Sequence, residues 1–270
     1  MQATATKLLA TLAEKGNYIF TFEQAFITAK ELGLNKIQLK RLLSNLVIDN
    51  WLWHLKKGLY AGVAKLPGFY NIPPFAIGCR LFTPSAVSHL SALHHHGFTD
   101  QLPLIITLTT TKKIVTPTMH QRDAINHQEH CVVSCGSKFL YKTVSQQRFF
   151  GHSEIWLDEN FKVAITDPER TILDAFIDPA WIGGFGESMG LLENALDQLS
   201  IPKLIDYLLR YDQGTVIKRL GWALASLGVP IEQLQVLLDF KVQCYHLLDK
   251  TKEAKGLYNK TWQVRENYKP

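Results

Sequence analysis

Apolar side chains recur at helical spacing in three segments near the start of the chain, which predicts three amphipathic helices. The segments are residues 4–15, 22–32 and 35–47. Thr21 followed by Gln24 has the spacing of a capping box, which marks the start of the second helix. Asn35 followed by Gln38 repeats this signal for the third helix. Gly33 ends the second helix, so only a short turn separates it from the third.

A different pattern follows these helices. From Trp51 to Val63 the apolar period becomes two, which predicts a β-hairpin with its turn at Lys57-Gly58. Two short capped helices, a tight turn and a hairpin together predict a winged helix-turn-helix over residues 17–65. A unit of this kind holds one helix in front of a scaffold, where the helix can enter a DNA groove.

The middle of the chain mixes strand and helix signals. A passage rich in Pro and Gly predicts a linker over residues 66–80. Thr83, Pro84 and Ser85 have the form of a helix start, with the helix continuing to Gly97. Three strand-like runs come next. They lie at residues 104–110, 139–144 and 161–166.

Helical patterns dominate the last hundred residues. Asp167 and Pro168 begin a helix that continues through Phe176. After Gly183-Gly184 the apolar periodicity predicts helices almost to the C-terminus. These helices are expected near residues 187–199, 201–211, 214–227 and 231–250.

The predicted fold class is therefore α+β and helix-rich. It consists of an N-terminal winged helix-turn-helix followed by a mixed α/β domain that ends in a helical segment. We predict a DNA-binding domain at residues 1–65, the linker at 66–80, and a C-terminal domain at 81–270 that is mixed to about residue 180 and helical after it.

Charge is distributed unevenly along the chain, whose net charge is +5. Residues 1–65 hold nine basic and four acidic side chains, or +5, and the tail from Lys250 holds six and two, or +4. Residues 66–249 hold 14 basic and 18 acidic side chains, or −4. Because cationic side chains displace condensed counterions from phosphates, the basic N-terminal part suits contact with nucleic acid.

Composition and segment lengths exclude several classes of protein. Hydrophobic residues make up 46% of the chain, which excludes a mainly disordered protein. The N-terminus has no basic region followed by a sustained apolar run, and no apolar stretch approaches the length needed to span a bilayer. Four scattered cysteines are too few for a disulfide framework in a chain of this size. We expect a cytoplasmic protein without membrane contact.

The third predicted helix carries the most informative chemistry. Asn and Gln side chains match adenine edges, Lys and Arg match guanine or phosphate, and Ser can serve either. On one face of a helix that follows a tight turn, such residues can read the major groove. Lys56 and Lys57 at the hairpin tip are expected to meet the phosphate backbone. The candidate DNA-binding residues are Gln38, Lys40, Arg41, Ser44, Asn45, Lys56 and Lys57.

Two groups of residues resemble metal ligands only weakly. Three consecutive histidines, residues 94–96, point in different directions around a helix and cannot converge on one ion without partners elsewhere. A second group suits zinc better by chemistry but lacks the paired Cys-x-x-Cys spacing, and its alternative interpretation is an ordinary surface loop. Its members are His127, His130, Cys131 and Cys135.

Enzyme signatures are absent: the sequence has no nucleophile elbow, P-loop, dinucleotide fingerprint or HExxH motif. Asp158, Glu159 and Lys162 resemble part of a nuclease site, but their spacing is more typical of a turn before a strand. Asp167 is expected to cap a helix, and Arg170 with Asp174, one turn apart, to form a buried structural pair. We therefore predict no enzymatic activity, no catalytic residue, no metal and no cofactor.

Three motifs follow one another along the chain. The predicted winged unit ends in K-K-G-L-Y, the next motif is L-F-T-P-S-A-V-S-H-L-S-A-L-H-H-H-G, and the third is V-A-I-T-D-P-E-R-T-I-L-D-A-F with Gly-Gly after it. In this order they resemble the AbiEi antitoxins of bacterial type IV toxin–antitoxin operons. The resemblance covers about residues 17–200, and its specificity comes from the order of the motifs, because each is short.

The resemblance implies a function that residue spacing does not show. AbiEi proteins repress their own operon by binding inverted repeats in its promoter through the N-terminal domain. Their C-terminal domain is associated with neutralising a co-encoded AbiEii toxin that resembles a nucleotidyltransferase, usually without a stable complex. Carried onto this chain, the resemblance assigns DNA reading to the third helix and the hairpin lysines, and it carries over no catalytic residue.

We therefore expect an autorepressor and antitoxin whose partners are double-stranded promoter DNA and such a toxin. The alternative is a nucleic-acid-processing or nucleotide-acting enzyme in which the winged domain serves only to localise it, and a protein-docking adaptor is a third possibility. The basic tail, with Tyr258, Trp262 and Tyr268 among its lysines, is expected either to contact DNA or a partner, or to form a solvated terminal helix whose aromatic side chains pack inward.

Overall fold

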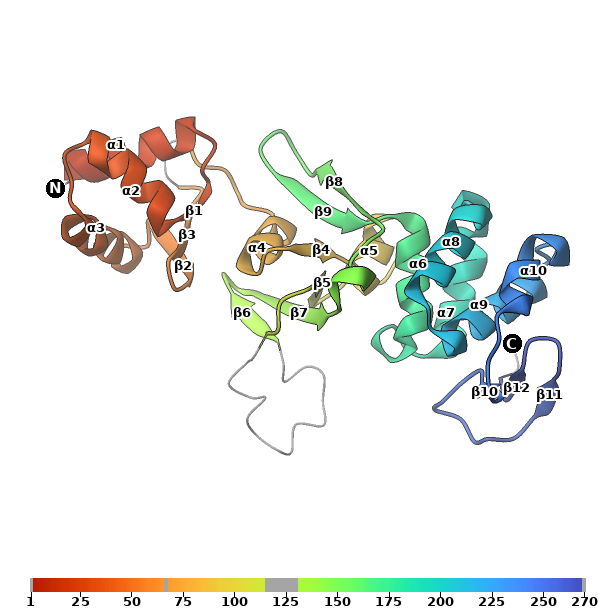
Figure 1. Cartoon of the computed structure of the whole chain (residues 1–270). Helices are drawn as coiled ribbons and strands as arrows, with labels where there is room; N and C mark the ends of the chain where they lie inside the picture. The colour runs from red at the N-terminus through yellow and green to blue at the C-terminus, as the bar shows by residue number, and fades with distance from the viewer. Residues whose placement is uncertain (1, 66–67, 115–130, 269–270) are drawn as a thin grey trace. The chain divides into compact units, whose positions relative to one another are not determined.

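The computed structural model describes residues 2–65, 68–114 and 131–268 (Figure 1). These residues form a mixed α and β structure, which confirms the predicted mixture of helices and strands. Within these three ranges, no helix is both long enough and apolar enough to cross a membrane.

The chain divides into two compact units, each drawn from several segments. The described residues of the first unit belong to 1–85, 115–140 and 154–163, and those of the second to 86–114, 141–153 and 164–270. The first unit thus contains the expected N-terminal domain together with later segments of the chain. The expected linker at 66–80 is partly helical, because helix α4 spans Pro74–Leu81.

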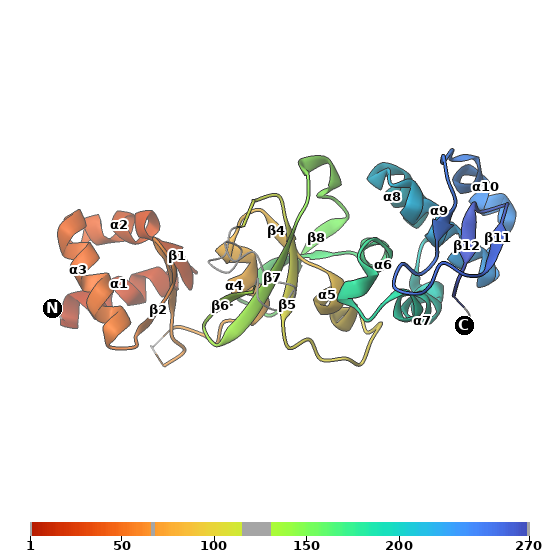
Figure 2. The same cartoon turned by 90° about the horizontal axis from the view of Figure 1, so that it is seen from below.

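Three helices and three short strands form the N-terminal part of the first unit. They are α1 (Gln2–Glu14), β1 (Ile19–Thr21), α2 (Phe22–Glu31), α3 (Lys36–Ile48), β2 (Leu52–Lys56) and β3 (Leu59–Gly62). Strand β3 lies between β1 and β2 and is antiparallel to both. Figures 1 and 2 show the three helices gathered on one side of this small sheet.

Helices α2 and α3 begin at the two predicted capping boxes. Thr21 Oγ1 accepts a hydrogen bond from the Gln24 backbone N–H (3.2 Å), and Gln24 Oε1 accepts one from the Thr21 N–H (2.8 Å). Asn35 and Gln38 form the same reciprocal pair, with both distances 2.9 Å. These bonds satisfy N–H groups that have no partner inside the helix. Between the helices, Gly33 has φ +74°, a left-handed conformation that costs glycine little.

The apolar stripe of α3 packs into the core of this part. Leu39 and Leu43 are fully buried and share a hydrophobic cluster with Leu8, Leu12 and Phe20, which are also fully buried. Burying one such side chain stabilises the fold by about 1.5–3 kcal/mol. The cluster therefore fixes which side of α3 faces the protein, and the opposite side is left for solvent.

A six-stranded sheet has the order β6-β7-β5-β4-β9-β8. Its strands are β4 (Ser85–Val87), β5 (Ile106–Thr110), β6 (Val132–Ser134), β7 (Ser137–Thr143), β8 (His152–Trp156) and β9 (Lys162–Thr166). Strands β6 and β7 are antiparallel, whereas β4 and β9 are parallel and pair Val87 with Ile165. Strands β5, β7 and β9 confirm the three predicted strand runs.

The prediction that a helix starts at Thr83-Pro84 is wrong. Residues 85–87 form β4, and the helix that follows, α5, spans only His89–His95. All three residues of β4 are buried, because the strand lies inside the sheet and pairs with a segment far along the chain. Here the pairing between distant strands outweighs a local helix-capping signal.

Five α-helices build the larger hydrophobic core, in the second unit. They are α6 (Pro168–Ile177), α7 (Phe185–Ala195), α8 (Ile201–Tyr211), α9 (Gly214–Ser226) and α10 (Ile231–Asp239), with short 3-10 turns at Gln146–Arg148, Pro179–Trp181 and Leu196–Gln198. Helix α6 begins as predicted at Asp167, whose Oδ1 accepts a hydrogen bond from the Arg170 N–H at 2.9 Å. Phe176 of α6 and Leu208 of α8 are fully buried in this core.

The prediction of helix up to residue 250 is wrong, because α10 ends at Asp239. The tail instead forms a small sheet of strands β10 (His246–Leu247), β11 (Leu257–Asn259) and β12 (Val264–Glu266). Strand β12 is central, parallel to β10 and antiparallel to β11. Trp262 and Val264 are buried in the helical core, so the tail is anchored. The predicted solvated terminal helix is therefore wrong, but the inward packing expected for its aromatic side chains is confirmed for Trp262.

Candidate nucleic-acid interface

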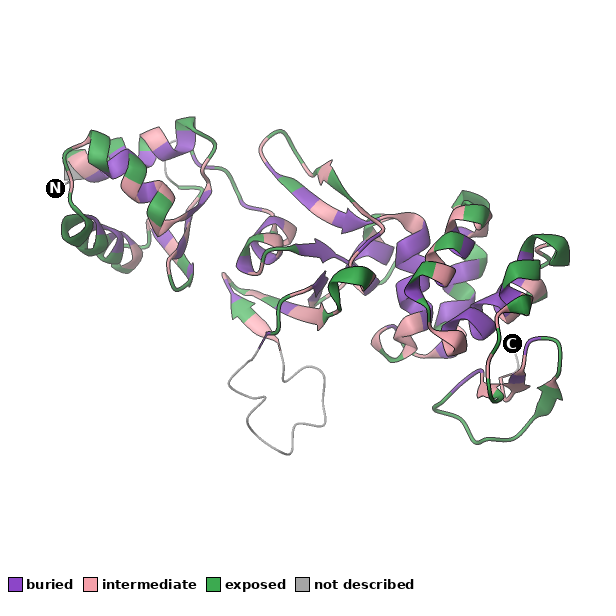
Figure 3. Cartoon of the chain, in the orientation of Figure 1, coloured by how far each residue is buried: buried purple, intermediate pink, exposed green. Residues whose placement is uncertain are grey.

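Helix α3 presents its polar side to solvent, as the green stretches of this helix in Figure 3 show. All five residues predicted to read bases are exposed, and the four buried residues of the helix are leucines on the other side. The exposed residues are Gln38, Lys40, Arg41, Ser44 and Asn45. Ile37 in the first turn is 68% exposed, so an apolar side chain stands among the polar ones.

Two of these five side chains make hydrogen bonds within the helix. Gln38 Oε1 accepts from the Asn35 N–H as part of the cap, which leaves its NH₂ group as the donor for a partner. Ser44 Oγ donates to the Lys40 carbonyl oxygen at 2.9 Å and keeps its capacity to accept. Arg41 and Asn45 lie one helical turn apart on this exposed face.

A shallow pocket of about 270 Å³ opens on the same face. Its lining joins α3 to the start of α1 and to the turn between α2 and α3. The lining residues are Thr4, Leu34, Gln38, Arg41, Leu42 and Asn45. Arg41 and Asn45 thus border a depression in which polar donors adjoin apolar surface, an arrangement suited to the edge of a base.

Positive charge surrounds this face. The ammonium groups of Lys30 and Lys36 lie 5.1 and 5.4 Å from the centre of the Phe26 ring, at the turn that leads into α3. The nearby carboxylate of Glu31 is 3.3 Å from Lys15 Nζ, so its charge is partly compensated. Exposed cations remain on a surface that phosphates can approach.

The structure separates the two hairpin lysines. Lys57 lies in the turn after β2 and is exposed. The Lys56 ammonium instead donates to the carbonyl oxygen of Leu81, the last residue of α4, and lies 5.0 Å from the centre of the Phe82 ring. Both lysines are exposed, but Lys56 also caps the C-terminal end of α4.

In the histidine triplet, the rings of His95 and His96 meet edge-on at 5.3 Å. His96 Nε2 lies 2.7 Å from the carbonyl oxygen of Thr166. Burial lowers the pKa of His95, and the neighbouring His96 and His94 lower it further. Within the described part of the chain, no three His, Cys, Asp or Glu side chains are placed to hold a metal ion.

Of the second candidate ligand group, the structure describes only the two cysteines. His127 and His130 lie outside the described residues. Burial raises the thiol pKa of both Cys131 and Cys135. A raised pKa favours the neutral thiol over the thiolate that binds metals and acts as a nucleophile.

Asp158 lies in the turn between β8 and β9, as the simpler interpretation predicted, and Lys162 is the first residue of β9. Asp158 Oδ1 accepts hydrogen bonds from the backbone N–H groups of Asn160 and Phe161, at 2.8 and 2.9 Å. Lys162 Nζ lies 2.8 Å from Glu154 on the paired strand. The carboxylate thus closes the turn between β8 and β9.

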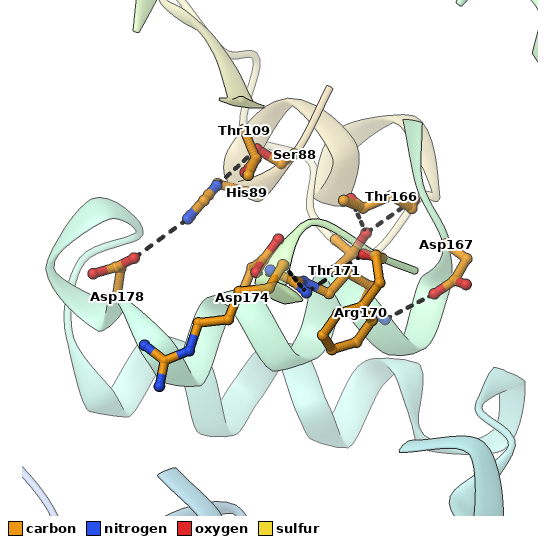
Figure 4. A network of polar contacts seen from close by, with 11 residues as sticks. Ser88, His89, Thr109, Thr166, Asp167, Arg170, Thr171, Asp174 and Asp178 are labelled. Atoms are coloured by element: carbon orange, nitrogen blue, oxygen red, sulfur yellow. Dashed lines mark hydrogen bonds and ion pairs between the residues drawn. The ribbon is translucent and has the colours of Figure 1, made fainter. Parts of the chain in front are cut away.

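The start of α6 is the centre of a polar network in the second unit (Figure 4). Arg170 Nε lies 2.8 Å from Asp174 Oδ1, and both side chains are almost fully buried, which confirms the predicted structural pair. Tyr207 donates to Asp167 Oδ2 at 2.8 Å, and burial together with this bond raises the Tyr207 pKa to about 12. Lys203 lies 3.1 Å from the same oxygen. The contacts from α8 join segments far apart in sequence, so no local pattern marked them.

A second buried group in Figure 4 has the residue types of a hydrolase triad. His89 Nδ1 is 2.9 Å from Ser88 Oγ, and His89 Nε2 is 3.6 Å from Asp178 Oδ2. Ser88 is fully buried and accepts a hydrogen bond from Thr109 Oγ1 at 2.9 Å. Because the hydroxyl is enclosed, it cannot meet a substrate, and the group holds α5 to its neighbours.

Comparisons with known proteins identify the fold but no family. No protein-family model matches the chain, and no curated protein matches it. Among solved structures, the chain is similar to the crystal structure of the RV2827C protein from Mycobacterium tuberculosis, with a TM-score of 0.64 and 16% sequence identity. The similarity covers 97% of this chain and 90% of that one. At this identity the match shows a shared fold only.

Proposed function

We propose that this protein binds duplex DNA through α3, as the reading helix of a winged helix-turn-helix, and represses its own operon. The observation that carries the proposal is the exposed row of amide, hydroxyl and cationic side chains on α3. The element order supports it, since two capped helices joined at Gly33 are followed by the β2–β3 hairpin.

The proposed contacts follow from side-chain chemistry. Asn45 offers a paired donor and acceptor that match adenine, and Arg41 offers two donors that match guanine. Lys40 and Lys57 bind phosphates and hold the helix in register without reading sequence. Gln38 contributes a donor from the first turn, where helix-turn-helix proteins contact base edges.

The antitoxin role rests on the resemblance to AbiEi proteins. In this proposal the chain recognises inverted repeats in its own promoter and counteracts a co-encoded AbiEii-like nucleotidyltransferase toxin without a stable complex. No cofactor or catalytic residue takes part. A growth assay with the neighbouring toxin gene tests this role. Co-expression of this chain with the toxin should restore growth. Removal of the α3 contacts should leave the rescue intact, because DNA reading and neutralisation use different parts of the chain.

A gel-shift titration with the operon's own promoter tests the DNA proposal. Arg41→Ala with Asn45→Ala should weaken binding at least about tenfold, since each base contact contributes about 1–3 kcal/mol. Both side chains are exposed, so the melting temperature should not change. The matched control is Gln101→Ala with Lys113→Ala, which removes one amide and one cation from exposed positions elsewhere. Equal promoter affinity of both double variants would refute the assignment of α3.

A further inference from the structure

The small tail sheet has an outer face defined by its register. Tyr258 of β11 and Leu247 of β10 both pair with Arg265 of the central strand β12. Residues directly opposite one another project to the same side of a sheet, so these three side chains form one row. The ring of Tyr245, just before β10, meets the Tyr258 ring edge-on at 5.0 Å. We call Tyr245, Leu247, Tyr258 and Arg265 the outer row.

The aromatic members of the outer row are open to solvent, although large aromatic rings are usually covered. Tyr245 is 42% exposed and Tyr258 is 56% exposed. The other side of the same sheet carries Val264, which is fully buried, and Trp262, next to β12, is buried with it in the helical core. The outer row therefore lies on a sheet that is anchored to the helical core. Two exposed rings in contact on a fixed base form a surface that a partner can cover.

The charge around the outer row is positive. The Arg265 guanidinium lies 4.9 Å from the centre of the Tyr258 ring. The acidic neighbours are engaged: Glu253 forms an ion pair with Lys255, and Glu266 accepts hydrogen bonds from Trp222 and Asn259. Three further exposed lysines lie between β10 and β12. They are Lys250, Lys252 and Lys260.

We propose that the outer row binds single-stranded nucleic acid, a site separate from α3 and independent of the function proposed for it. Unpaired bases stack on Tyr245 and Tyr258 and on the planar guanidinium of Arg265, and the surrounding lysines contact the phosphates. A duplex fits this surface less well, because its base faces are already stacked on one another and cannot reach the rings. The exposed rings thus favour a single strand, whereas the lysines alone would not distinguish the two.

Fluorescence anisotropy with the full chain tests the proposal, using mixed-sequence RNA and DNA single strands of about 12 nucleotides and a duplex of the same non-promoter sequence. The single strands should bind more tightly than the duplex. Tyr258→Ala should weaken single-strand binding about fivefold or more, since stacking on one ring contributes about that much. Tyr258→Phe should keep the affinity, because the ring remains. Binding of the RNA strand, the DNA strand or both would support the site, and the comparison shows which kind of nucleic acid it binds.

Two controls show whether a loss of single-strand binding comes from this site rather than from misfolding or from α3. Trp156→Ala removes another exposed aromatic side chain with a lysine beside it, and single-strand affinity should not change. Promoter affinity of Tyr258→Ala should equal that of the parent chain, and an unchanged melting temperature checks that the variant is folded. Truncation after Asp249 is unsuitable, because it removes the buried Trp262. The proposal is overturned if single strands and duplex bind equally, or if Tyr245→Ala with Tyr258→Ala leaves single-strand affinity unchanged.

Discussion

Arg170 and Asp174 form an ion pair of 2.8 Å, one turn apart inside α6, with side chains that are 2% and 3% exposed. The Arg170 guanidinium also donates to the carbonyl oxygens of Arg148 and Phe150, at 2.9 and 3.4 Å. Asp174 therefore neutralises the buried charge of Arg170. The guanidinium of Arg170 in turn connects α6 to the segment that precedes β8. Each partner depends on the other, because an unpaired charge in this position would be poorly solvated.

Removing the acidic partner should strongly destabilise the fold. Asp174→Ala leaves the Arg170 charge buried without its carboxylate, and we expect the free energy of unfolding to fall by about 3–5 kcal/mol. Urea denaturation measures the change. Asp206→Ala, at an exposed position of α8, is the control and should change the free energy by less than about 0.5 kcal/mol. A similar destabilisation of the two variants would contradict a structural role for the pair.

Ile37 should contact the methyl group of a thymine, if α3 enters the major groove as proposed. Promoter DNA made with deoxyuridine lacks these methyl groups and should bind the parent chain about fourfold more weakly for each methyl group that Ile37 covers. Ile37→Ala should bind both DNAs equally, because the short alanine side chain does not reach the thymine methyl group. Ile48→Ala removes an isoleucine that is 74% exposed at the other end of α3, and it should keep the preference for thymine.

Because of Asp178, the free energy of unfolding of the second unit should fall as the pH becomes acidic. Burial alone would raise its pKa, but His89 at 3.6 Å and Lys142 at 2.9 Å hold the pKa below its ordinary value. A carboxyl whose pKa is lower in the folded chain stabilises the fold above its unfolded value of about 3.9, and that contribution is lost as the pH falls through the folded pKa.

Asp178→Asn should therefore lower the free energy of unfolding by about 1–2 kcal/mol at neutral pH, and the difference from the parent chain should shrink as the pH falls below about 4. Urea denaturation from pH 7 to pH 3 measures this difference. Asp197→Asn, at an exposed position, serves as the control. A difference that stays constant across this range would show that the charge of Asp178 does not stabilise the fold.

Two helical glycines should respond to alanine with opposite signs. In α9, a methyl group on Gly221 would overlap the ring of Trp262, so Gly221→Ala should destabilise the fold by about 1–3 kcal/mol and loosen the tail sheet. In α7, a methyl group on Gly190 meets no atom within 4 Å, so Gly190→Ala should stabilise the helix by about 0.5–1 kcal/mol. Thermal unfolding measures both. A stable Gly221→Ala variant would show that Trp262 can move away.

Much of the fold was predictable where the decisive contacts are local. The capping boxes at Thr21 and Asn35 and the cap at Asp167 join residues two or three positions apart, so their spacing in the sequence is enough to locate three helix starts. The exposure of Arg41 and Asn45 followed from the apolar period of the same helix, because burying one stripe directs the opposite stripe outward.

Tertiary structure alone decided the features that depend on distant segments. Ser85–Val87 became a strand because a partner strand about eighty residues away pairs with it. The Lys56 ammonium found the carbonyl oxygen of Leu81 as a partner, and the tail became a sheet because Trp262 packs into the helical core. Helix caps and apolar periods are set by neighbours along the chain, whereas strand pairing and burial depend on segments that only the folded chain brings together.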